Sequence, residues 1–88
     1  MRYLVIEKFT DGPAPVYARL SQRGRLLPSG LVYLDSWVDE RSLERCFQLM
    51  ETEDPRLFDE WIANWQDLAE FEIVPVISST EAARRSGP

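Results

Sequence analysis

Apolar and polar residues follow two different periods along the chain, and the period changes several times between the two ends. Alternation with a period of two, typical of half-buried strands, predicts four strands: Arg2–Phe9, Leu31–Asp39, Arg45–Glu51 and Phe71–Ile77. Apolar residues three or four positions apart predict two helices: Pro15–Leu27 and Pro55–Leu68. The order of these elements is that of the ferredoxin-like βαββαβ sandwich. We therefore expect an α+β fold in which two helices cover one face of a four-stranded antiparallel sheet.

The second predicted helix has the clearest signals. Asp54 followed by Pro55 is typical of a helix start, because Asp accepts a backbone hydrogen bond there and Pro lacks a donor that would go unused. Its apolar stripe contains four large residues: Phe58, Trp61, Trp65 and Leu68. Aromatic side chains at this spacing usually seal a helix against a sheet, so we interpret both tryptophans as core.

Two other positions limit the neighbouring elements. Gly24 lies within the first predicted helix and leaves two interpretations open, close packing against the sheet or an early helix end. Pro75 has no N–H group, so the last strand is expected at an edge of the sheet. Arg19, Arg23 and Arg25 form a small basic patch, which we interpret as a solvated helix face or, alternatively, as an anion contact.

The middle hairpin predicts which side chains share a face. A loop over residues 40–43 places Tyr33 opposite Met50, Asp35 opposite Gln48 and Trp37 opposite Cys46. We expect the helix-covered face to carry mostly apolar side chains: Leu4, Ile6, Val32, Leu34, Ser36, Val38, Phe47 and Leu49. We expect the open face to mix aromatic and polar side chains: Tyr3, Val5, Glu7, Phe9, Tyr33, Asp35, Trp37, Cys46, Gln48 and Met50.

An open face with several aromatic residues is normally covered by a partner or lines a cavity. We predict that six residues there bind a small apolar or aromatic molecule: Glu7, Tyr33, Asp35, Trp37, Cys46 and Gln48. Glu7 and Asp35 are the best paired carboxylates for proton transfer, since burial of either would raise its pKa. The favoured interpretation is structural, with Arg19, Arg23 or Gln48 pairing with them. Cys46 is interpreted as a small buried hydrophobe rather than a nucleophile.

Composition excludes several classes of function. The chain has 88 residues, a net charge of −5 and no histidine, so a nucleic-acid surface, a metal site and a serine triad are not expected. Cys46 is the single cysteine, which rules out an internal disulfide and favours a reducing compartment. No apolar run has the length of a signal peptide or a membrane span, so we expect a cytoplasmic protein without a membrane partner.

We expect one domain over residues 1–78 and a short C-terminal helix or tail over residues 79–88. The tail changes to small and charged residues, with Thr80 as the expected helix cap. No glycine-rich phosphate loop or other cofactor motif is present, so no cofactor is predicted.

Five segments together resemble a known family: residues 24–28, 35–37, 45–52, 57–65 and 71–76. The chain is similar, over about residues 1–85, to a family of short bacterial proteins described as domain of unknown function 3303. That family is similar in fold to the dimeric α+β barrels, in which two sheets pair around a central cavity. The resemblance implies a homodimer formed through the open sheet face, and it implies no catalytic residues.

The expected function is therefore small-molecule binding by a cytoplasmic homodimer, with the cavity at the open face. Relatives in the wider superfamily include cofactor-independent monooxygenases and small isomerase-like proteins. The alternative is thus an enzyme of that kind, with Glu7 or Asp35 handling a proton, an analogy at the level of fold.

Overall fold

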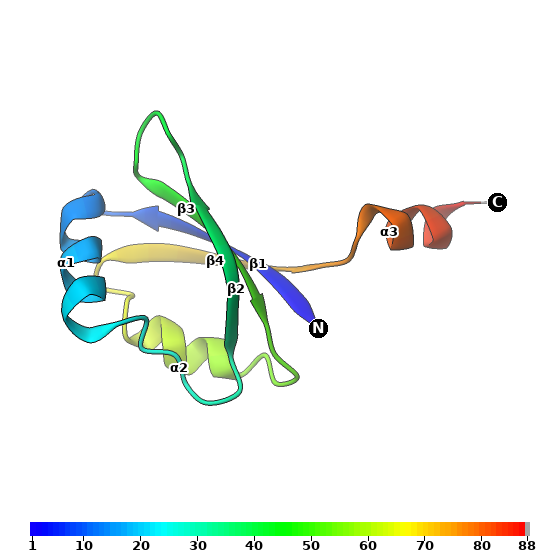
Figure 1. Ribbon diagram of the computed structural model, residues 1–88, viewed down its shortest axis with the longest axis horizontal. Coiled ribbons are helices and arrows are strands. Elements are labelled where there is room, and N and C mark those ends of the chain that lie inside the picture. The colour runs from blue at the N-terminus through cyan, green and yellow to red at the C-terminus, as the bar shows by residue number, and fades with distance from the viewer. Residues whose placement is uncertain (88) are drawn as a thin grey trace.

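The computed structural model describes residues 1–87 as one antiparallel sheet with helices packed at its end and on one face (Figure 1). Its elements, in chain order, are β1 (Arg2–Phe9), α1 (Pro13–Arg23), β2 (Val32–Val38), β3 (Arg45–Glu51), α2 (Leu57–Ala63), β4 (Ala69–Val76) and α3 (Ser79–Ser86). The strand order is β2-β3-β1-β4, and every neighbouring pair is antiparallel. The predicted α+β class and four-stranded antiparallel sheet are confirmed.

The helices differ from their predicted lengths for local reasons. α1 ends at Gly24, whose φ of 71° lies in the left-handed region that glycine tolerates, so the early helix end is the correct interpretation. α2 ends at Ala63, and the chain beyond it continues in turns, with the Trp65 N–H donating to the Ile62 carbonyl at 2.9 Å. The residues that follow α1 and α2 therefore lie in loops and turns rather than in helices. Figure 1 shows α2 against one face and α1 across one end of the sheet.

The prediction of which face the helices cover is wrong for β1 and β3 and correct for Ser36 and Val38 of β2, which pair with Gln48 and Cys46. The covered face carries seven buried side chains of β1 and β3: Tyr3, Val5, Glu7, Phe9, Cys46, Gln48 and Met50. Their neighbours on the other face are only half-buried: Leu4, Ile6, Phe47 and Leu49. The polar members of the covered face are tolerated because Gln48 Nε2 donates a hydrogen bond to Glu7 Oε1, which satisfies both groups.

A bulge in β2 changes the predicted hairpin register. Tyr33 pairs with Met50 as predicted, but the register shifts before Asp35, which pairs with Leu49 instead of Gln48. Beyond the bulge, Trp37 pairs with Phe47 rather than Cys46. The hairpin then closes with the Asp39 N–H bonded to the Arg45 carbonyl at 2.8 Å, which leaves residues 40–44 in the loop. Asp35 and Trp37 consequently lie on the open face with Phe47 and Leu49.

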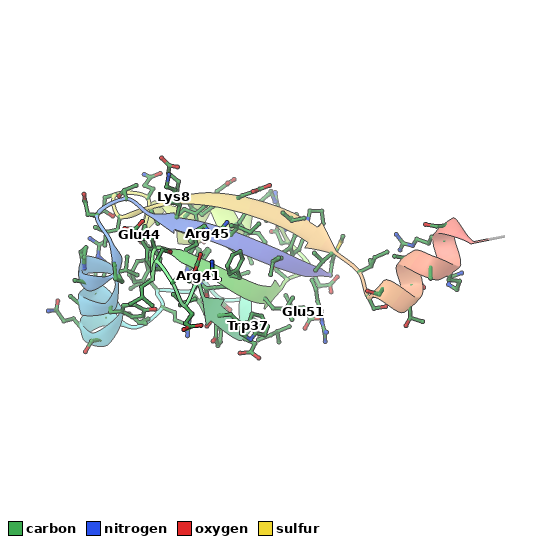
Figure 2. All side chains as sticks on the ribbon, turned by 90° about the horizontal axis from the view of Figure 1, so that it is seen from above. Lys8, Trp37, Arg41, Glu44, Arg45 and Glu51 are labelled. Atoms are coloured by element: carbon green, nitrogen blue, oxygen red, sulfur yellow. The ribbon has the colours of Figure 1, made fainter. Side chains whose placement is uncertain are left out.

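Figure 2 views the sheet from the side away from α2, with four side chains of this open face labelled: Lys8, Trp37, Arg45 and Glu51. Here and below, the open face means the side of the sheet that carries Leu4, Ile6, Phe47 and Leu49. β1 and β3 are central, and β4 with Pro75 forms an edge, as predicted from the missing N–H group of Pro75. The open face is therefore broad, uncovered and apolar at its centre.

The interpretation of both tryptophans as core is confirmed. Trp61 is 3% exposed and Trp65 is 6% exposed. The Trp61 ring packs edge-on against Phe71, with 5.4 Å between the ring centroids. Phe58 from the same helix packs edge-on against Tyr3, with 5.0 Å between the centroids. These aromatic contacts join α2 to β1 and β4.

α3 stands clear of the sheet beyond β4 (Figure 1). Its first turn is capped by Ser78, whose hydroxyl accepts a hydrogen bond from the Glu81 N–H at 3.1 Å, so Thr80 is not the cap. None of its residues is buried. The predicted tail over residues 79–88 includes Pro88, which lies outside the described residues.

The burial of the tryptophans predicts large losses of stability on truncation. Trp61→Ala should lower the free energy of unfolding by about 3–5 kcal/mol, because it removes a buried indole and leaves a cavity. Leu43→Ala in the hairpin loop is the control, since Leu43 is 50% exposed and its truncation should cost about 0.5 kcal/mol or less. Urea unfolding followed by circular dichroism measures both; equal effects would contradict the packing.

Candidate functional site

A partly open cavity of about 80 Å³ lies between the covered face of the sheet, α1 and the tryptophan pair. Six apolar side chains form most of its wall: Phe9, Val16, Leu20, Val38, Trp61 and Trp65. They come from β1, α1, β2 and the α2 region, so the cavity exists only when these elements are packed together. Tyr17, which is 44% exposed, also lines the cavity and places it close to solvent.

One wall of the cavity is a chain of three polar side chains. The Gln48 amide nitrogen donates to the Glu7 carboxyl, and Arg25 Nη1 donates to Gln48 Oε1 at 3.2 Å. The Arg25 guanidinium lies over the Tyr33 ring, with its carbon 3.5 Å from the ring centroid. Gln48 therefore bridges a carboxyl and a guanidinium, with its amide nitrogen toward Glu7 and its amide oxygen toward Arg25.

Arg25 reaches this position because its backbone is tied to the α2 region. Trp61 Nε1 and Trp65 Nε1 both donate to the Arg25 carbonyl, at 3.1 Å and 3.0 Å. The Asn64 side chain also donates to the Leu26 carbonyl at 3.2 Å. These three hydrogen bonds hold the connection between α1 and β2 against the residues at the end of α2, and the Arg25 side chain then extends toward the sheet.

Glu7 is the carboxyl group that lines the cavity, and its ionisation is strongly perturbed. Burial raises the pKa of its carboxyl from 4.5 to about 7, although the Gln48 hydrogen bond and the Arg25 charge both act to lower it. Both protonation states are consequently populated near neutral pH. A carboxyl of this kind can accept or donate a proton to a bound molecule.

Cys46 lies directly across from Glu7 in the β1–β3 ladder. Burial raises the pKa of its thiol to about 12, and the nearby Glu7 charge adds to the increase. The thiol is therefore protonated at neutral pH and is a poor nucleophile. This agrees with its interpretation as a small buried hydrophobe.

The structure separates the six predicted site residues. Glu7, Cys46 and Gln48 line the cavity together, on the covered face. Tyr33 is half-buried under Arg25, and its hydroxyl is bonded to the Ser36 hydroxyl at 2.6 Å. Asp35 is exposed and Trp37 is 53% exposed, both on the open face, so the predicted pair of Glu7 and Asp35 does not form.

Sequence reasoning missed the contribution of the α1–β2 connection to the site. Arg25 had been grouped with Arg19 and Arg23, but Arg19 instead forms a two-pronged contact with Asp67, with both bonds at 2.7 Å. The available signal was Gly24, because a helix that ends there turns Arg25 into a loop residue. The sequence pattern indicates only packing for the two tryptophans, because their shared hydrogen-bond acceptor, the Arg25 carbonyl, has no signature in the sequence.

Residues 1–87 contain neither a metal-binding cluster nor a membrane-spanning helix. Among residues 1–87, no three His, Cys, Asp or Glu side chains lie close enough to hold a metal ion. No helix within the same residues has the length and apolar character needed to span a bilayer. The cavity brings a carboxyl, an amide and a guanidinium together beside apolar walls.

The chain matches the family model described as Domain of unknown function (DUF3303) over residues 1–87. It belongs to this family. No curated protein and no solved structure matches the chain significantly. The DUF3303 assignment confirms the resemblance seen in the sequence and carries no activity of its own, so function has to be argued from the cavity.

The raised pKa of Glu7 predicts a specific pH dependence of stability in this DUF3303 chain. In the unfolded chain Glu7 loses its proton near pH 4.5, whereas the folded protein retains it to about pH 7. The folded state binds more protons in this range, so the Glu7 contribution to the free energy of unfolding falls as the pH rises. The free energy of unfolding of Glu7→Gln should therefore rise, relative to that of wild type, by roughly 2–3 kcal/mol between pH 5 and pH 8.

Urea unfolding of both proteins across that pH range measures the difference. Glu60→Gln is the matched control, because Glu60 is an exposed carboxylate on α2 outside the cavity lining. A pH-independent difference between Glu7→Gln and wild type would show that Glu7 titrates normally.

Proposed function

We propose that this protein binds a small molecule with an apolar or aromatic body in the cavity between the sheet, α1 and the tryptophan pair. The observation that carries the proposal is the polar chain of Glu7, Gln48 and Arg25 at one wall of a mainly apolar cavity. Binding sites typically combine apolar walls with a few fixed polar groups that orient the ligand. The site differs from the expectation in lying under the helices rather than at the open face.

The size of the cavity limits what enters it. A volume of about 80 Å³ is about half of the roughly 150 Å³ of an engineered cavity that takes up benzene. One polar group and the edge of a ring or a short branched chain therefore fit inside. A larger ligand extends outward past the exposed ring of Tyr17.

We also propose that two copies pair through the open face, as ferredoxin-like sandwiches forming a dimeric α+β barrel in the cytoplasm. Support comes from the apolar residues that this face leaves uncovered: Leu4, Ile6, Trp37, Phe47, Leu49, Val74 and Val76. A contiguous apolar surface of this kind usually marks an interface. The cavity lies on the opposite side of the sheet, so ligand binding and pairing use separate surfaces.

A second candidate function is cofactor-independent catalysis, in which Glu7 transfers a proton to or from the bound molecule. The pKa of about 7 favours this role, since a general acid or base works best when its pKa lies near the working pH. Asp35 lies on the opposite face of the sheet, away from the cavity, so the role falls to Glu7 in this proposal. Turnover of a bound compound that is lost in Glu7→Gln would distinguish catalysis from binding alone.

Filling the cavity tests the binding proposal. Leu20→Trp places a larger side chain at a cavity-lining position of α1, and it should weaken binding of small aromatic compounds by about tenfold or more. Ser21→Trp is the matched control, because Ser21 is the exposed neighbour on the same helix. Isothermal titration calorimetry compares the two variants; equal affinity in both would place the ligand elsewhere.

Charging the open face tests the assembly proposal. Leu49→Lys introduces a cation at the centre of that face and should convert the dimer into a folded monomer, since an unpaired buried charge is strongly disfavoured at an interface. Leu43→Lys, in the exposed hairpin loop, should leave the dimer intact. Sedimentation velocity gives the masses, and a wild-type monomer at micromolar concentration would contradict the proposal.

A further inference from the structure

We propose that the ligand of the cavity is a small monocarboxylate, held through the Arg25 guanidinium with its apolar or aromatic body against the tryptophan pair. This inference rests on the proposed binding function and names the chemical class that the site accepts. The evidence is the set of Arg25 donors without a protein acceptor, together with the apolar walls of the cavity.

Arg25 is a half-buried cation that no carboxylate of residues 1–87 contacts directly, although Glu7 lies near enough for the two charges to interact. Within residues 1–87, six arginines have a carboxylate at salt-bridge distance: Arg2, Arg19, Arg45, Arg56, Arg84 and Arg85. Arg25 has none in the same part of the chain, and only its Nη1 has a hydrogen-bond acceptor, the Gln48 amide oxygen. A guanidinium carries five N–H donors, so most of the Arg25 donors are available to a ligand.

The Arg25 side chain is held ready for an anion. The Tyr33 ring covers one face of the guanidinium at 3.5 Å, and the Gln48 contact fixes one of its edges. The Arg25 backbone is held separately by the two indole N–H groups. A planar guanidinium that is already ordered loses little freedom on binding, and its parallel donors match the two oxygens of a carboxylate.

Charge and wall chemistry favour a monocarboxylate over other charged ligands. Arg25 is the single basic residue among those that line the cavity, so a doubly charged phosphate would keep an uncompensated charge there. A cationic ligand would be placed beside Arg25 and repelled by it. The apolar walls, with Trp61 and Trp65 among them, match a hydrocarbon body rather than a bare inorganic ion.

Glu7 is compatible with an anion because it can enter its neutral form. The titratable or charged groups that face it are Arg25 from the α1–β2 connection, Cys46 from β3 and Tyr17 from α1. α2 and β4 contribute uncharged aromatic rings there, those of Trp61 and Phe71. An anion beside Arg25 therefore favours protonation of Glu7, and binding should take up a proton near neutral pH.

Three probes of the same shape and different charge test the ligand class: benzoate, benzamide and benzylamine. Isothermal titration calorimetry at pH 7 should give an affinity for benzoate at least about tenfold above those of the neutral and cationic probes. The benzoate affinity should also rise from pH 8 to pH 6, because benzoate stays ionised while Glu7 becomes neutral. Benzylamine should show no such rise.

Arg25→Gln should weaken benzoate binding by about tenfold or more and change benzamide binding little. The Arg25 carbonyl remains in place for both indoles, and thermal unfolding checks that the variant is folded. Arg23→Gln is the matched control, since Arg23 is exposed and outside the cavity lining. Arg25→Lys keeps the charge but removes the planar guanidinium, so its benzoate affinity should lie between those of Arg25→Gln and wild type. It replaces Arg25→Gln in the test if that variant does not fold.

The outcomes separate this inference from the proposed function. Benzamide or benzylamine binding as tightly as benzoate, or benzoate binding unchanged in the Arg25 variants, would overturn the carboxylate assignment while leaving the cavity as a binding site. An affinity for benzoate that rises with pH would overturn it as well. Failure of all three probes to bind would contradict small-molecule binding in the cavity itself.

Discussion

Two buried indole N–H groups share one backbone acceptor, and the rest of the site depends on that arrangement. Trp61 and Trp65 cannot be buried without acceptors for their N–H groups, and the Arg25 carbonyl serves both. This carbonyl is available because α1 ends at Gly24, before Arg25 joins the helical hydrogen-bond pattern. The contact ties the α1–β2 connection to α2, closes one side of the cavity and directs Arg25 toward Gln48.

The covered face of the sheet has a composition that stability alone does not explain. A carboxyl and an amide lie in the middle of a domain of 88 residues, where apolar side chains of similar size would contribute more to folding. The burial of Glu7 is tolerated because Gln48 donates to it and because its pKa is raised enough for the neutral form to exist at neutral pH. Buried acids with raised pKa values are characteristic of functional sites, and here the acid lines the cavity.

The sequence was sufficient to predict the elements but not the facing of the sheet. The strand alternation and Pro75 led to the correct order of elements and the correct edge strand. The predicted helix start at Asp54-Pro55 was two residues early, because α2 begins at Leu57 with Arg56 as its N-cap and no side-chain cap. Alternation divides a strand into two sets, however, and both sets here are apolar: Val5 and Met50 are as suitable for a core as Leu4 and Leu49. The polar residues Glu7 and Gln48 made the wrong set look exposed, because their mutual hydrogen bond spans β1 and β3 and is not visible in either strand alone.

Two further features depend on local geometry that no period in the sequence reveals. The bulge between Tyr33 and Asp35 moves Trp37 out of line with Cys46, so the six predicted site residues divide between the two faces. Arg25 enters the site from a loop, and its role depends on two tryptophans far along the chain. Glu7, Cys46 and Gln48 could be predicted as neighbours because the pairing of β1 with β3 follows from the order of elements.

The central claim is that Glu7 is buried under the helices beside Gln48 and Arg25. The most direct test is a titration of the Glu7 carboxyl carbon by ¹³C NMR in the intact protein, assigned by comparison with Glu7→Gln. The account predicts a midpoint at about pH 7, since burial dominates the surroundings of this carboxyl. A midpoint near the ordinary value of 4.5 would contradict it, because Glu7 would then face solvent and the cavity would lack its acid.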